Sequence, residues 1–154
     1  MATLTVSAQL TATPDGLWRL LQRFDAYPQW LAVHDSFPVP PKAPPETGGA
    51  FVQCVTVLGM AGELHWTFED VRPGRLVVMN TPLTANARLR AVLRLEPRDA
   101  GTLMTCRYEV TGGRAADALV RVAGAEARKQ TRAALEALDR LARRECPGGL
   151  GAVG

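Results

Sequence analysis

Residues 115–143, AADALVRVAGAEARKQTRAALEALDRLAR, decide the fold because they are predicted to form one long amphipathic helix. The inward stripe recurs at helical spacing and consists of Ala116, Val120, Ala123, Ala127, Thr131, Ala134, Leu135, Leu138 and Leu141. The first half of this stripe holds only small side chains, with Gly124 beside them, whereas the second half holds leucines. Small side chains leave space against a facing sheet and leucines fill it. The stripe therefore predicts a cavity under the first half of the helix and a solid core under the second.

Ahead of this helix, apolar and polar residues alternate in segments that are bounded by turn residues. The segments are residues 3–11, 50–58, 62–71, 75–80, 86–96 and 102–111. One face of each segment is apolar and the other is mostly polar, which is typical of an antiparallel sheet with one face in water. Only the C-terminal helix is long enough to cross the dry face. The order of elements predicts an α+β fold, in which a curved antiparallel sheet of about six or seven strands wraps around the long C-terminal helix.

Two short helices are predicted after the first strand. Thr-Pro-Asp at residues 13–15 supplies an N-cap, a proline at the first helical position and an acidic residue in the first turn. This helix is expected to end near residue 25, and a second short helix then carries Trp30. Residues 32–49 hold five prolines and show no periodicity, which predicts a long, stiff connection that acts as a lid or rim.

Composition narrows the class of protein. The chain has 154 residues, of which 47% are apolar and 21% charged, as in globular proteins. We expect one domain over residues 1–143 and a flexible tail over residues 144–154. No segment predicts a membrane-inserted helix or a signal peptide, so the expected location is the cytoplasm. Three cysteines without CxxC spacing favour free thiols over disulfides or zinc ligands.

Charge and motifs exclude several kinds of partner. The net charge is +3, but basic residues are not interleaved with exposed aromatic ones, so no nucleic-acid partner is expected. The chain lacks the GxGxxG, Walker, GxSxG and HExxH motifs. Neither a nucleotide cofactor nor a metal is therefore expected.

Aromatic and polar residues around the predicted cavity are the candidates for chemistry. Trp30 and Trp66 are either packing anchors or cavity walls against which a flat ligand stacks. His34 is either a loop histidine held by a backbone carbonyl or a proton shuttle at the cavity rim. Strand alternation places further polar residues on or near the dry face, where they would orient a ligand or hold water. These are Gln53, Asp70, Asn80 and Tyr108.

The motif D-x-Y-P-x-W-L spans residues 25–31 and is followed by His34. Together with the order of elements, it resembles the polyketide cyclase/dehydrase and lipid-transport family. That family belongs to the helix-grip superfamily, which also includes START domains and the birch-pollen allergen. Within it the chain is most similar to a short actinobacterial branch labelled toxin-like, through the V-x-G-M turn at residues 57–60 and the W-T pair at residues 66–67.

The resemblance implies a helix-grip domain that binds a hydrophobic, polyketide-type small molecule and promotes its cyclisation or dehydration. Such an enzyme would be a cofactor-independent lyase or isomerase of secondary metabolism. Conformational templating would supply proximity, and His34, Tyr108 or Asn80 would move or polarise protons. The expected ligand-binding residues are Trp30, Trp66, Asn80, Met104, Ala123 and Gly124.

Two alternatives to an enzyme stay open. One is a non-catalytic carrier or sensor of lipids or aromatic metabolites, and the other is a toxin-like interaction protein that is regulated by a partner. Under each of them the chain could be a monomer or a homodimer.

Overall fold

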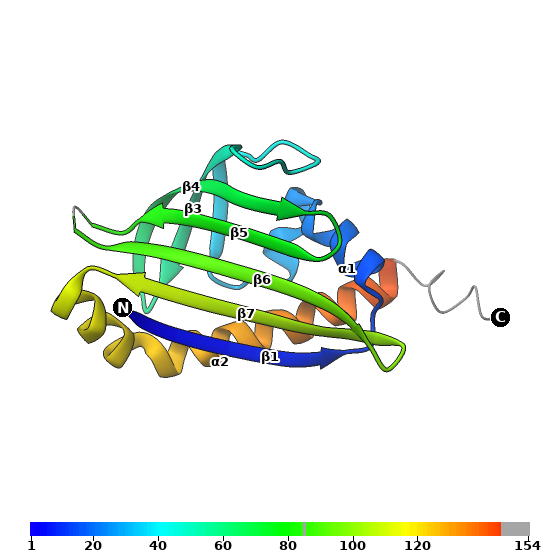
Figure 1. Cartoon of the computed structure of the whole chain (residues 1–154). Coiled ribbons are helices and arrows are strands. Elements are labelled where there is room, and N and C mark those ends of the chain that lie inside the picture. Colours follow the sequence, from blue (N-terminus) through cyan, green and yellow to red (C-terminus); the bar gives the residue numbers. More distant parts are fainter. Residues whose placement is uncertain (85, 146–154) are drawn as a thin grey trace.

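A seven-stranded antiparallel sheet that curves around a long helix dominates the computed structural model, which describes residues 1–84 and 86–145 (Figure 1). The strands are β1 (Ala2–Leu10), β2 (His34–Val39), β3 (Ala50–Val57), β4 (Met60–Arg72), β5 (Leu76–Pro82), β6 (Arg88–Arg98) and β7 (Gly101–Thr111). Their order across the sheet is β1-β7-β6-β5-β4-β3-β2. The helices are α1 (Pro14–Leu21), the 3-10 helix η1 (Phe24–Gln29) and α2 (Gly113–Glu145). The predicted α+β helix-grip architecture is confirmed.

The proline-rich connection differs from its prediction. Residues 34–39 form the edge strand β2, so of the predicted connection only residues 32–33 and 40–49 remain irregular. β2 pairs with β3 through two register shifts, and a proline at position 38 is tolerated because an edge strand does not need every backbone N–H. These irregularities hide the strand period in the sequence.

Two further boundaries also differ from their predictions. The second short helix is the 3-10 helix η1, which contains Pro28 and ends before Trp30. Of the predicted flexible tail, residues 144 and 145 are the last residues of α2, and residues 146–154 lie outside the described part of the chain.

The second half of α2 closes the main hydrophobic core, as its leucines predict. Leu135, Leu138 and Leu141 are buried against residues of α1, β1 and β7, among them Leu17 and Met104. Burial of a leucine side chain contributes about 1.5–3 kcal/mol. This core holds the C-terminal half of α2 against one end of the sheet.

Asp139 anchors the same half of α2 to the turn between β1 and α1. Its carboxylate accepts hydrogen bonds from the backbone N–H of Ala12 at 2.8 Å, and from the backbone N–H and hydroxyl of Thr11 at 3.2 and 3.1 Å. The side chain is buried, so these hydrogen bonds replace water that the carboxylate loses on folding. Asp139 therefore fixes where the helix crosses the end of β1.

The first half of α2 packs more loosely. Val120, Ala123, Gly124 and Ala127 are only half-buried, and a Cβ added to Gly124 would meet nothing within 4 Å except Val120 of the same helix. The helix packs mainly against β1, β7 and α1, and not against the strands at the other edge of the sheet. The concave face of those strands is thus left without a tight helical cover.

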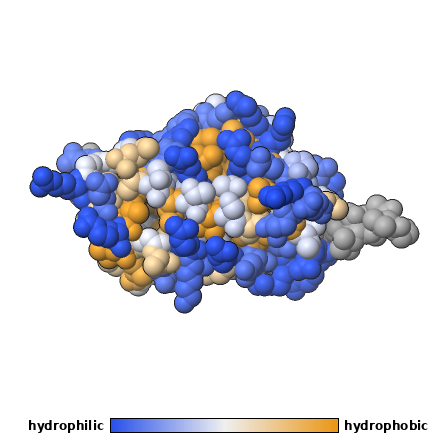
Figure 2. All heavy atoms as spheres, turned by 60° about the horizontal axis from the view of Figure 1, so that its bottom comes forward, coloured by the Kyte–Doolittle hydropathy of each residue, from blue (hydrophilic) through white to orange (hydrophobic). Residues whose placement is uncertain are grey.

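The surface on the side of α2 and β1 mixes hydrophilic and apolar areas (Figure 2). Leu119 and Val122, in the first half of α2, are 46% and 78% exposed. A hollow of about 470 Å³ lies between β1 and the second half of α2, where Asp139 is part of its lining. No helix among residues 1–84 and 86–145 is long and apolar enough to cross a membrane.

Candidate ligand site on the concave face

Apolar rings cover the concave face of the sheet opposite the first half of α2. We call the buried residues there the aromatic cluster, which consists of Phe51, Trp66, Phe68, Val77 and Ala91. Around it, Leu64, Met79, Leu89 and Leu93 are only partly buried. Apolar side chains are therefore partly accessible both around the aromatic cluster and in the first half of α2.

Three polar side chains form a hydrogen-bonded chain at the β2–β4 edge of this face. Trp66 on β4 donates its indole N–H to the Oε1 atom of Gln53 on β3 at 3.0 Å. The Nε2 atom of Gln53 lies 3.0 Å from Nδ1 of His34, the first residue of β2. All three residues are buried, and His34 is 8% exposed. We call this arrangement the His34–Gln53–Trp66 chain.

The surroundings of His34 favour the neutral imidazole. Burial lowers the pKa of His34 below 6.5, and the neighbouring carboxylate of Asp35 offsets this shift only in part. The imidazole lies against Phe37 and Tyr27, with ring centroids 4.3 and 5.8 Å away. A charged imidazolium would lose hydration in this apolar setting, so His34 stays neutral at neutral pH.

A second polar pair links the sheet to α2. The hydroxyl of Tyr108 on β7 lies 3.1 Å from the hydroxyl of Thr131 on α2. Tyr108 packs against both the main core and the aromatic cluster, and burial raises its pKa to about 12. Tyr108 is therefore a protonated phenol at neutral pH, able to donate or accept one hydrogen bond.

The other residues predicted to bind a ligand have different surroundings. Trp66 belongs to the aromatic cluster, and Ala123 and Gly124 are half-buried in the first half of α2. Met104 is 0% exposed within the main core, where it packs rather than lines a space. Trp30 is also buried in the main core, and among the described residues its indole Nε1 is the one fully buried side-chain nitrogen or oxygen without a hydrogen-bond partner.

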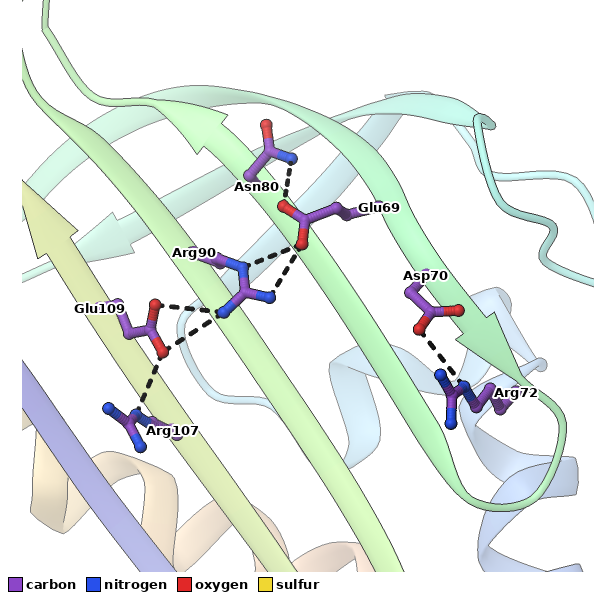
Figure 3. A network of polar contacts seen from close by, with 7 residues as sticks. All are labelled: Glu69, Asp70, Arg72, Asn80, Arg90, Arg107 and Glu109. Atoms are coloured by element: carbon purple, nitrogen blue, oxygen red, sulfur yellow. Dashed lines mark hydrogen bonds and ion pairs between the residues drawn. The ribbon is translucent and has the colours of Figure 1, made fainter.

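Asn80 lies on the outer face of the sheet, which corrects the prediction that it faces the dry side (Figure 3). Its side chain donates to Glu69 at 3.4 Å and accepts from Arg88. Strand alternation failed here because β5 has buried apolar residues on both faces, so its period does not mark the concave side. Asp70 was also predicted to lie on or near the dry face. A register shift in β4 between residues 68 and 70 interrupts the alternation on which that prediction depended.

Figure 3 shows that Asn80 is part of an outer ionic network centred on Arg90. The Arg90 guanidinium donates to Glu69 at 2.9 Å and to Glu109 at 3.2 Å, and Arg107 donates to Glu109 at 3.1 Å. Hydrogen bonding from Arg90 lowers the pKa of Glu69. The charges of this network pair with one another beside an open hollow of about 370 Å³, and exposed pairs of this kind add little stability.

Sequence reasoning missed Phe37 and Thr131. Phe37 contacts the rings of Phe24, Tyr27, His34 and Phe51, and it joins η1 to the aromatic cluster. Its position directly before Pro38 concealed that residues 34–39 form a strand. Thr131 was assigned only to the inward stripe of α2, and its pairing with Tyr108 depends on how helix and sheet cross.

Residues 1–144 match the model of a family described as polyketide cyclase / dehydrase and lipid transport. The chain belongs to this family. The match supports a ligand-binding helix-grip protein, in agreement with the partly accessible apolar side chains on the concave face. Among residues 1–84 and 86–145, no three His, Cys, Asp or Glu side chains lie close enough to hold a metal ion.

Individual relatives of this family member are distant in sequence. Toxin Rv0910 of Mycobacterium tuberculosis is 20% identical over 112 residues, which cover 73% of this chain and 78% of the toxin. The crystal structure of Ara h 8.0201 superposes with a TM-score of 0.70 at 11% identity, over 92% of this chain and 97% of the other. The di-domain ARO/CYC StfQ from the steffimycin biosynthetic pathway gives a TM-score of 0.71 at 15% identity, over 94% of this chain and 51% of StfQ. The two structural likenesses show the fold alone.

Proposed function

We propose that this protein binds a hydrophobic, polyketide-type small molecule between the concave face and the first half of α2, and promotes its cyclisation or dehydration. The observation that carries the proposal is the partial accessibility of apolar side chains around the aromatic cluster and of Ala123 and Gly124 on α2, which would border an open space between them. Family membership and the likeness to a cyclase of known fold support the ligand class. Residues 1–143 would form one ligand-binding domain, which acts in the cytoplasm as monomer or homodimer.

The chemistry would rest on position more than on strong acids or bases. Holding a flexible chain folded against aromatic walls places its reacting atoms together, which supplies much of the rate enhancement. His34 and Tyr108 would donate hydrogen bonds to oxygen atoms of the substrate, since both are neutral at neutral pH. In that role they polarise a carbonyl or a leaving hydroxyl.

A non-catalytic carrier is the second candidate, and one observation favours it. The pKa of His34 is lowered and that of Tyr108 is raised, so neither group changes charge near neutral pH, as a proton shuttle would. The name of the mycobacterial relative raises a third candidate, a toxin-like protein that acts through a partner.

The location of the site is tested with the fluorescent probe anilinonaphthalene sulfonate and two matched variants. Ala123→Phe fills the open space, whereas Ala125→Phe adds the same ring to an exposed position two residues away. We expect Ala123→Phe to lower probe affinity at least about tenfold, equivalent to about 1.4 kcal/mol, and Ala125→Phe to leave it unchanged. Equal affinities in both folded variants would place the site elsewhere.

Native mass spectrometry of the protein isolated from its own host then separates the first two candidates. The mass of the bound molecule identifies its class. On incubation of that molecule with the protein, an enzyme converts it to a product, and dehydration lowers its mass by one water. A carrier returns the molecule unchanged.

A further inference from the structure

We propose that Gln53 and Trp66 are positioning residues that hold His34 as a neutral imidazole with its proton on Nε2. The ligand site then presents a fixed hydrogen-bond donor, and it selects molecules that carry an oxygen acceptor, such as a ketone, next to an apolar ring system. The choice of ligand rests on the proposed function, whereas the state of His34 does not.

The donor and acceptor chemistry of the chain determines the orientation of each member. An indole N–H can only donate, so the amide atom of Gln53 that faces Trp66 must be its carbonyl oxygen. The NH₂ group of Gln53 then faces His34 Nδ1 at 3.0 Å and donates to it. A ring nitrogen that accepts a hydrogen bond carries no proton. The proton of the neutral imidazole is therefore on Nε2.

The same chain opposes protonation of His34. An imidazolium carries N–H groups on both ring nitrogens, so its Nδ1–H would point at the NH₂ group of Gln53. Gln53 cannot turn its oxygen toward His34 without leaving the Trp66 N–H unpaired in a buried position, which is unfavourable. The charged and titratable neighbours are Asp35, whose carboxylate accepts from Thr56 at 2.6 Å, and Tyr27, whose hydroxyl donates to the Leu21 carbonyl at 3.0 Å. Neither side chain hydrogen-bonds to the imidazole.

The Nε2 atom is available to a ligand. It has no hydrogen-bond partner among residues 1–84 and 86–145. In that part of the chain, the one side-chain nitrogen or oxygen that is both fully buried and without a partner is Trp30 Nε1, so His34 Nε2 is not fully buried. The Nε2 atom therefore reaches the accessible surface. It lies beside the rings of Phe37 and Tyr27, so a bound molecule there meets one N–H donor within an apolar wall. An amine or ammonium group, which donates, finds no acceptor on this imidazole.

The state of His34 is tested by ¹⁵N NMR of the ligand-free protein. The chain has two histidines, and His65 is exposed and paired with Glu63, so it serves as an internal reference. We expect the His34 signals of an unprotonated Nδ1 and a protonated Nε2, and a titration midpoint of His34 below 6.5. A protonated Nδ1 in the wild-type protein would overturn the proposal.

Two variants test the positioning role. Gln53→Glu offers a carboxylate that accepts from both Trp66 and His34, so the proton should move to Nδ1 and the titration midpoint of His34 should rise by about one pH unit or more. Trp66→Phe removes the donor that orients Gln53, so both tautomers should appear. If either folded variant keeps the wild-type tautomer and midpoint, Gln53 and Trp66 merely pack. Should Gln53→Glu not fold, Trp66→Phe decides alone.

The ligand preference is tested with acetylnaphthalene and ethylnaphthalene, which have nearly the same shape but differ in one carbonyl oxygen. One added hydrogen bond should make acetylnaphthalene bind about threefold to tenfold more tightly than expected from its apolar area, and His34→Phe should abolish that difference. Equal binding by the wild-type protein would refute the acceptor preference. Binding of neither probe would count against the proposed function, while the tautomer result would still confirm or refute the positioning role.

Discussion

Replacing Asp139 by alanine should destabilise the protein more than any other single removal of a charged side chain on α2. The carboxylate accepts three hydrogen bonds from the β1–α1 turn, one of them from the N–H of buried Ala12 at 2.8 Å. In Asp139→Ala that N–H loses its acceptor and stays buried, which costs about 1–3 kcal/mol. The groups of exposed Thr11 can turn to water, so they add about 1 kcal/mol.

The expected loss for Asp139→Ala is therefore about 2–4 kcal/mol, or a melting temperature about 5–15 °C lower for a domain of this size. Asp139→Asn keeps one oxygen acceptor, so it should lose about half as much. The matched control is Glu136→Ala, an exposed position one turn earlier on the same helix. It should change stability by less than about 0.5 kcal/mol.

Urea unfolding followed by circular dichroism measures these differences as changes in midpoint at constant slope. An Asp139→Ala variant within about 0.5 kcal/mol of the wild-type protein would refute the reasoning, because the turn would then not depend on the carboxylate.

Three other substitutions have definite outcomes. Gly101→Ala should cost at least about 2 kcal/mol in urea unfolding because its Cβ would collide with the backbone carbonyl of Leu10, whereas Gly62→Ala, which faces open space, should be nearly neutral. Since the folded pKa of His34 is depressed, its contribution to stability is present above pH 6.5 and is lost as the pH falls through the folded pKa. The wild-type protein should therefore lose more unfolding free energy than His34→Gln between pH 7 and pH 5. Equal losses in the two proteins would contradict this. Tyr108→Phe should cost about 1 kcal/mol and should remove a phenolate absorbance that, in the folded wild-type protein, appears only near pH 12.

Much of the fold could be predicted because most helices and strands show a clear periodicity of apolar residues in the sequence. Five strands alternate cleanly or nearly so, β5 is a short apolar run between turn residues, and α2 repeats small and leucine residues at helical spacing, so these ranges agree with the structure to within two residues. The edge strand β2 could not be predicted, since two register shifts and Pro38 disrupt its alternation. Its conformation is determined by pairing with β3, and the residues of β2 alone do not reveal that pairing.

The candidate site was predictable only as separate residues. His34, Gln53 and Trp66 each stood out as polar or aromatic positions near the dry face, but their contact depends on the register between three strands. Asn80 shows the opposite case, because buried residues on both faces of β5 leave the side that it faces undetermined by sequence. Pairing between distant elements, rather than local propensity, is the missing information.

The unequal packing of α2 along its length has an evolutionary consequence. Residue 123 and Leu138 are 15 positions apart, which is about 22 Å along a helix, well beyond the about 7–10 Å within which substitutions usually couple. The effects on stability of substitutions in the first half of α2 should therefore add to those of substitutions among the leucines of its second half. Selection can vary the size and shape of the accepted molecule at one end of the helix while the other end keeps the protein folded.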